Sequence, residues 1–187
     1  FQKILKQESD QILSQGPYAL TIKNGILIPN AGIDHSNAQD ETIILWPTNI
    51  QNYLENLRKK LQKHFQIKKL GLLAIDSHCQ PLRNGVTGLC LAFSGFQGVE
   101  DLRGQPDLFG TPLEVTKRNI ADMLASAATF VMNEANQKTP FAIIRQAKIT
   151  FTDKKIDSTK LMRIKPDDCL FKTLYPQKCI KKIAHLP

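Results

Sequence analysis

The chain has 187 residues, a hydrophobic fraction of 42% and a formal net charge of +8 at pH 7. A chain of this length can bury one substantial hydrophobic core, with room for a small attached lobe. No run approaches the roughly 18 apolar residues that a membrane span requires, and no secretory leader is visible. We therefore expect no membrane partner, and the pattern of the cysteines favours a reducing compartment, by default the cytoplasm; a start at Phe1 rather than Met suggests a piece of a longer chain.

The cysteines and the basic residues indicate which ligands the protein could bind, a zinc ion or an anionic molecule. The four cysteines at positions 79, 90, 169 and 179 form no CxxC pair, which favours free thiols over a zinc site. Basic residues gather at 58–63, 68–69 and 154–182. Such a surplus suits nucleic acid or an anionic small molecule such as a nucleotide. Because few aromatic residues lie among the basic clusters, a nucleic-acid or other polyanion binder is the lesser alternative.

The first quarter of the chain predicts a helix followed by a β-hairpin. Residues 2–13 have the spacing of a short amphipathic helix. Residues 18–29 consist of two β-rich runs around Asn24-Gly25, a pair that accepts the positive φ angles of a two-residue hairpin turn. The hairpin leads into residues 30–37, which contain Asp34.

A second helix is predicted after Pro47, capped by Thr48 or Asn49. We expect an apolar stripe on one side of it, formed by Ile50, Leu54, Leu57, Leu61 and Phe65. The basic residues Arg58, Lys59 and Lys63 are then expected on the opposite, solvated face.

The stretch from residue 70 to residue 116 is the centre of the functional prediction. Residues 70–75 indicate a buried strand that ends on Asp76-Ser77, and residues 86–93 indicate another. Residues 100–110 carry charges, Gln, Pro and two glycines without a helical or strand period. Connections of that length usually bind something or are disordered.

The last third predicts a long helix from a cap at Thr116 to about Asn133. Its expected buried side is Ile120, Met123, Leu124, Ala127, Val131 and Met132. The small residues 125–128 permit close approach of another element, and residues 141–151 resemble a strand. The irregular order of elements predicts an α+β or mixed α/β fold, with a mixed sheet, one antiparallel hairpin and packed helices. Neither GxxxxGK[ST] nor GxGxxG occurs, so a P-loop and a Rossmann fold are not expected.

Two acids, Asp34 and Asp76, follow apolar runs and make a metal site conceivable. Mg²⁺ and Mn²⁺ prefer oxygen ligands, and the Ser77 hydroxyl and a carboxylate at Glu134 are further candidates. The alternatives are an Asx-turn at Asp34 and a turn or cap at Asp76, and the residues alone leave these open. No catalytic spacing involves His35, His78 or Cys79.

Three motifs resemble those of one family. Residues 30–37 match N-A-G-[VI]-D-x-S-N, residues 76–85 resemble D-T-x-G-R-P-W-R-x-G, and residues 101–116 resemble D-x-R-G-x-x-D-x-[FY]-G-x-x-L-x-V-T. Over residues 1–175 the chain resembles the γ-glutamyl ligases of the deazaflavin coenzyme F420. The resemblance implies a homodimeric ligase that depends on GTP and on Mn²⁺ or Mg²⁺, with K⁺ as a further candidate ion. It would join L-glutamate to the coenzyme precursor or another acid through an acyl phosphate, releasing GDP and phosphate.

The resemblance also implies roles for individual residues. The metal ligands would be Asp34, Asp76, Ser77 and Glu134. The catalytic residues would be Asp76 and Arg83. The nucleotide would contact Asn37, Met132, Asn133, Ala135 and Asn136, and the acid substrate Arg103, Gln105 and Asp107.

The chain also departs from the family pattern. Cys79 and Asn133 stand where the family has glycines, and Leu82 stands where it has a tryptophan. The family's opening segment does not precede Phe1, so we expect a ligase-like core at residues 1–153 and a basic extension, 154–187, that packs on it. These departures motivate the alternative of a non-catalytic or altered-substrate relative that binds a nucleotide or another anion.

Overall fold

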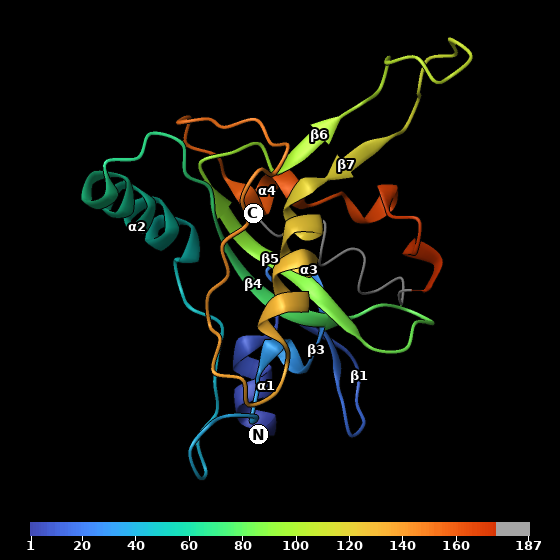
Figure 1. Ribbon diagram of the computed structural model, residues 1–187. Coiled ribbons are helices and arrows are strands. Elements are labelled where there is room, and N and C mark those ends of the chain that lie inside the picture. The colour runs from blue at the N-terminus through green and yellow to red at the C-terminus, as the bar shows by residue number, and fades with distance from the viewer. Residues whose placement is uncertain (175–187) are drawn as a thin grey trace. The chain divides into compact units, whose positions relative to one another are not determined.

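The computed structural model describes residues 1–174, which combine helices with small sheets (Figure 1). The main elements are α1 (Gln2–Glu8), β1 (Gln11–Ser14), β2 (Leu20–Lys23), β3 (Ile26–Pro29), α2 (Ile50–Phe65), β4 (Leu72–Cys79), β5 (Val86–Ser94), β6 (Val99–Asp101), β7 (Lys117–Asn119), α3 (Ile120–Met132) and α4 (Ser158–Met162). The predicted mixed α+β class is confirmed. Residues 1–48, 78–84 and the described residues from Arg163 onward form one compact unit, and residues 49–77 and 85–162 form a second.

The first unit is built on an antiparallel sheet in the order β1-β2-β3. The predicted hairpin is confirmed: Leu20 pairs with Pro29 at its open end, and Asn24 and Gly25 form the turn with φ angles of 51° and 73°. Buried apolar side chains join the sheet to its neighbours, namely Leu5, Ala19, Ala31 and Ile33. The helix predicted over residues 2–13 ends at Glu8, and Ile12 lies in β1 instead. The pairing of β1 with β2 provides hydrogen-bond partners for the backbone N–H and C=O groups of these residues, which in a longer helix would have bonded within the helix.

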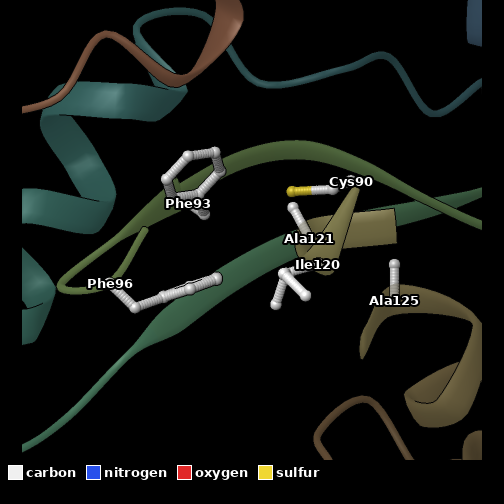
Figure 2. Packing of buried hydrophobic residues seen from close by; sticks show 6 residues of the cluster. All are labelled: Cys90, Phe93, Phe96, Ile120, Ala121 and Ala125. Carbon is white, nitrogen blue, oxygen red and sulfur yellow. The ribbon is translucent and has the colours of Figure 1, made fainter. Parts of the chain in front are cut away.

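The core of the second unit lies between β5 and α3. Figure 2 shows the side chains of Cys90, Phe93 and Phe96 together with those of Ile120, Ala121 and Ala125 of α3, and the six residues form one buried cluster. The predicted close approach at residues 125–128 is confirmed, because a Cβ at Gly88 would collide with the backbone of Ala125. Ser126 adds a hydrogen bond from its hydroxyl to the Gly88 carbonyl, 3.1 Å long. A glycine on the strand therefore lets helix and strand pack with their backbones in contact.

Helix α2 begins after Asn49 as predicted, but its buried face was predicted only in part: Leu54 of the apolar stripe is buried. Arg58 is 3% exposed, whereas Phe65, assigned to the apolar stripe, is 61% exposed. Nε of Arg58 donates to Ser94 Oγ at 3.0 Å, and Nη1 donates to Asp153 Oδ1 at 2.9 Å. A buried guanidinium is tolerated because these partners satisfy its donors. Arg58 therefore does not contribute to a solvated cationic face.

Several element boundaries also differ from the predictions. Strand β4 continues through Asp76 to Cys79, so Asp76 lies within a strand and not at its end. The cap of α3 is Asn119 rather than Thr116: its side chain accepts a hydrogen bond from the Asp122 amide at 3.1 Å. The N-cap therefore lies three residues later than the predicted Thr116, and residues 117–119 form strand β7. On α3, Met123 and Val131 are 56% and 58% exposed, so the buried face predicted there is only partly correct.

The segment after α3 contains no continuous strand. Residues 141–151 were predicted as a strand, but only an isolated bridge between Phe96 and Phe151 is formed within them. Helix α4 contacts β5, and Ile156 and Met162 pack against the core. The rest of the basic extension, residues 175–187 with Cys179, lies outside the described residues.

Two further expectations concern the thiols and the membrane. Cys79 and Cys90 are free thiols, as predicted. Burial, together with the nearby charge of Asp122, raises the pKa of Cys90, so that thiol stays protonated at neutral pH. None of the helices in residues 1–174 is long and apolar enough to cross a lipid bilayer.

Candidate functional site

The segment that carries Asp34 starts with a left-handed turn. Asn30, Ala31 and Gly32 have φ angles of 50°, 55° and 67°. Positive φ is unfavourable for a residue with a side chain, and such a conformation persists only where surrounding contacts enforce it. We call residues 30–37 the anchored loop.

Buried and part-buried hydrogen bonds hold the left-handed turn in place. Asn30 exchanges two bonds with Ala19: its amide donates to the Ala19 carbonyl at 2.7 Å, and its Oδ1 accepts from the Ala19 amide at 2.9 Å. The Ala31 amide donates to the fully buried Thr21 hydroxyl oxygen at 2.8 Å. That hydroxyl in turn donates to the Ile28 carbonyl. The hairpin β2–β3 thus holds the anchored loop through polar atoms that are shielded from water.

Two more contacts fix the chain on either side of Asp34. The indole of Trp46 lies against Gly32 so closely that a Cβ at that position would overlap the ring. Asp34 forms an antiparallel bridge with Ile44, with N···O distances of 3.1 and 2.8 Å. The backbone of Asp34 is therefore fixed although the residue itself is exposed.

The carboxylate of Asp34 is oriented by Ser36. The Ser36 amide donates to Asp34 Oδ1 at 2.8 Å, and the Ser36 hydroxyl lies 2.7 and 2.6 Å from the two carboxylate oxygens. This is the Asx-turn that the sequence left open as an alternative. It does not oppose metal binding, because a carboxylate has about four acceptor positions and two donors leave others available.

The other proposed metal ligands belong to the second unit. Asp76 is half-buried within β4, and its Oδ1 accepts a hydrogen bond from the Ser77 amide at 2.8 Å. Glu134 is exposed in the turn that follows α3. The side chains of these residues, like that of Asp34, would bind a metal through oxygen atoms, which are the ligands that Mg²⁺ and Mn²⁺ prefer. Across residues 1–174, no three His, Cys, Asp or Glu side chains gather into a group that could hold a metal ion.

The residues proposed for the nucleotide lie at the end of α3 and in the anchored loop. Met132 is the last residue of α3, and Asn133 caps it by donating its amide to the Thr129 carbonyl at 2.9 Å. The Ala135 amide donates to the Gln137 side chain at 3.0 Å, while Asn136 is exposed. Asn37 lies in the other unit, exposed and with a φ of 55°.

The three residues proposed for the acid substrate share one β-ribbon, residues 99–119, which we call the arm (Figure 1). Strands β6 and β7 form its base, and the ladder continues through bonds between Leu102 and Thr116 and between Gly104 and Leu113. The long connection that the sequence left without a period is thus ordered by backbone pairing, and its first residues belong to β6.

Within the arm, two of the proposed substrate residues have partners of their own. The Arg103 guanidinium binds both carboxylate oxygens of Asp101, at 2.8 and 2.5 Å. Asp107 Oδ1 accepts from the amides of Phe109 and Thr111, both at 2.8 Å, and so holds the tip. The Gln105 backbone pairs with Leu113. Arg103 and Asp107 therefore have structural contacts besides any role towards a substrate.

Arg83 lies in an exposed turn of the first unit. Its amide donates to the Gln80 carbonyl at 3.3 Å, and the preceding Leu82 is fully exposed with a φ of 56°. The turn therefore presents both side chains to solvent. Asp34, Asn37 and Arg83 belong to the first unit. The other proposed site residues belong to the second unit.

Two positioning contacts were not identified from the sequence. Ser36 was part of a motif without a role, although an Asp followed two residues later by Ser is a recognisable Asx-turn pattern. Thr21 had no such signal, because its importance comes from a bond to Ala31, ten residues away.

Comparison with known proteins identifies the family. The model of the F420-0:gamma-glutamyl ligase family matches residues 1–146. The chain belongs to this family. It is 35% identical over 168 residues to the coenzyme F420:L-glutamate ligases of Methanococcus maripaludis and Methanocaldococcus jannaschii, covering 89% of this chain and 66% of each relative. It is 33% identical over 148 residues to that of Methanopyrus kandleri, covering 78% of this chain and 58% of the relative. The chain thus spans less than two thirds of the length of these curated relatives.

Proposed function

We propose that the protein is an amide ligase that joins L-glutamate to the carboxylate of the coenzyme F420 precursor at the expense of GTP. The match to the γ-glutamyl ligase family over residues 1–146 carries this proposal. The names of the relatives, which are coenzyme F420:L-glutamate ligases, supply the substrates. The anchored loop adds local support, because it presents an oriented and exposed carboxylate at Asp34.

The reaction that we propose has two steps. A carboxylate oxygen of the acid attacks the γ-phosphorus of GTP, forming an acyl phosphate and releasing GDP. The glutamate amine then attacks the acyl carbon, phosphate leaves with the bonding electron pair, and the amine loses a proton. Phosphoryl transfer depends mainly on positioning and charge stabilisation. A divalent cation, Mn²⁺ or Mg²⁺, would supply positive charge where negative charge develops on the phosphoryl oxygens.

This chain's own residues would bind and orient the reactants. Asp34, Asp76, Ser77 and Glu134 are proposed to hold the cation, with K⁺ as a second candidate ion. Asp76 is also proposed as catalytic, together with Arg83, whose exposed guanidinium can pair with an anionic oxygen. The polar turn after α3 and Asn37 are proposed to contact the nucleotide. We further propose that the protein is a cytoplasmic homodimer.

The decisive experiment measures GDP release together with the mass of the product. The protein is incubated with GTP, L-glutamate, the coenzyme precursor and Mn²⁺, and each component is omitted in turn. We expect one GDP per amide formed, and no product when any component is missing. Asp34→Asn and Asp76→Asn should abolish turnover, whereas Glu41→Gln, which neutralises another exposed acid of the first unit, should not. Product formation without GDP release would contradict the proposal.

The acceptor is the part of the proposal most open to change. Leu82 is fully exposed and stands where the resemblance predicts tryptophan, and we propose on this ground that the surface that contacts the acid has altered. If the acceptor is a different acid, the coenzyme precursor should react slowly, and Leu82→Trp should raise its turnover. If the protein is a non-catalytic relative, calorimetry should detect GTP binding in the presence of Mn²⁺ without any GDP release.

A further inference from the structure

The anchored loop contains a side chain whose contacts concern Asp34 directly. Ser36 lies two residues after Asp34 and contributes both its amide and its hydroxyl to that carboxylate. The three distances lie between 2.6 and 2.8 Å, within the normal range for hydrogen bonds to a carboxylate. Ser36 thus orients the Asp34 carboxylate through both its backbone amide and its hydroxyl.

The orientation matters because Asp34 is exposed. A free carboxylate on the surface samples several rotamers, and ordering it upon binding a ligand has an entropic cost. Here the Asp34 backbone is fixed by the bridge to Ile44, and the carboxylate is fixed by Ser36. A cation that binds Asp34 would therefore meet a ligand that is already in place, which favours binding.

The bonds from Ser36 leave room for a cation. A serine hydroxyl has a single proton, so at any moment it donates to only one of the two oxygens that it approaches. With the amide bond to Oδ1, two of about four acceptor positions are occupied. The remaining lone pairs belong to an exposed carboxylate.

We propose that Ser36 is a positioning residue that holds the Asp34 carboxylate ready to bind a divalent cation. The inference rests on the proposed function for the assignment of Asp34 to the metal. It goes beyond that assignment because Ser36 would act through Asp34 without contacting the cation. Partners of this kind around metal ligands typically change metal affinity by about 10- to 100-fold when removed.

The test compares three variants of the whole chain by titration with MnCl₂, with and without GTP, while free Mn²⁺ is quantified by electron paramagnetic resonance. Ser36→Ala removes the hydroxyl, Ser36→Thr retains it, and Asp34→Asn removes the ligand charge. We expect Ser36→Ala to weaken Mn²⁺ binding about tenfold, Ser36→Thr to stay within about threefold of the parent, and Asp34→Asn to bind most weakly. Ser14→Ala, an exposed serine at the end of β1, is the matched control and should bind normally.

A merely structural role for Ser36 would give a different pattern. The metal-free melting temperatures of the parent, Ser36→Ala and Ser36→Thr should agree to about 1 °C, because Ser36 is exposed and its truncation leaves no cavity. Parent-like Mn²⁺ affinity of Ser36→Ala, while Asp34→Asn loses binding, would overturn the inference and leave the proposed function intact. A lower metal-free melting temperature of Ser36→Ala, without rescue by Ser36→Thr, would also overturn it. If neither the parent nor Asp34→Asn binds Mn²⁺, both proposals fail.

Discussion

The anchored loop and the arm both present acidic side chains to solvent, but different interactions hold them in place. The anchored loop is held by a hydrogen bond between its fully buried Ala31 and the fully buried Thr21 of β2, which is shielded from water. In the arm, backbone hydrogen bonds and exposed ion pairs hold the ribbon together. Its tip is open to solvent, with Leu108 and Phe109 exposed by 92% and 90%.

The comparison shows how burial decides the effect of a contact on stability. A buried polar group that loses its partner has the full desolvation penalty, whereas an exposed group can turn to water. Exposed ion pairs, such as Arg118 with Glu100, contribute little for the same reason. The anchored loop should therefore be coupled to global unfolding, and the arm should respond locally.

The largest effect is expected from Thr21→Val. Valine keeps the shape but removes the acceptor of the buried Ala31 amide and the donor to the Ile28 carbonyl. We expect a loss of about 2–3 kcal/mol in the free energy of unfolding, measured by urea denaturation. Thr21→Ser retains the hydroxyl and should lose about 1 kcal/mol, the effect of one methyl group. Equal losses in the two variants would show that packing and not hydrogen bonding secures the loop.

The next largest effect is expected from replacing a glycine by alanine, which can be compared at Gly32 in the anchored loop and at Gly104 in the arm. Gly32 and Gly104 have positive φ angles of 67° and 81°, so alanine is strained by about 1 kcal/mol at each. At Gly32 the new methyl would also overlap Trp46, whereas nothing lies within 4 Å at Gly104. We expect Gly32→Ala to destabilise the protein by about 1–2 kcal/mol more than Gly104→Ala in urea denaturation. A larger loss at Gly104 would reverse the comparison.

A smaller, local effect is expected at the arm tip. Asp107→Ala removes the acceptor of the Phe109 and Thr111 amides. Hydrogen exchange of these two amides should accelerate, while the free energy of unfolding should change by less than about 0.5 kcal/mol, since the tip is exposed. Asp107→Asn retains a carbonyl oxygen and should keep most of the protection. A large change in global stability would show that the arm supports more than itself.

The smallest effect is a shift of one titration. The hydrogen bonds and charge of Arg103 lower the pKa of Asp101 from an ordinary value of 3.8 to about 2. Because the pKa is lowered on folding, the contribution of this pair is fully present above about pH 4 and is lost as the pH falls towards 2. Carboxyl resonances followed by NMR should show this low pKa, and Arg103→Leu should return it towards the ordinary range. An unchanged pKa in Arg103→Leu would contradict the pairing.

Local patterns of the sequence predicted some elements correctly. Asn24-Gly25 was sufficient for the hairpin, because few residue pairs accept two positive φ angles. The helix after Asn49 and the strand near residues 86–93 were also predicted, since their hydrophobic patterns are long. The motifs at residues 30–37, 76–85 and 101–116 predicted the family, which the match over residues 1–146 confirms.

Tertiary contacts decided the features that depend on residues far apart in the chain. Arg58 is buried because Ser94 and Asp153 accept its hydrogen bonds, and no helical periodicity predicts such distant partners. The helix predicted to extend to Leu13 ends early because the residues that follow it pair with β2 as strand β1. Likewise, Thr21 holds the anchored loop through a bond that spans ten residues. The sequence alone therefore determined turns, periodic elements and the family, because these depend on neighbouring residues. The folded chain determined which charged and polar groups are buried, because desolvation depends on what packs around them.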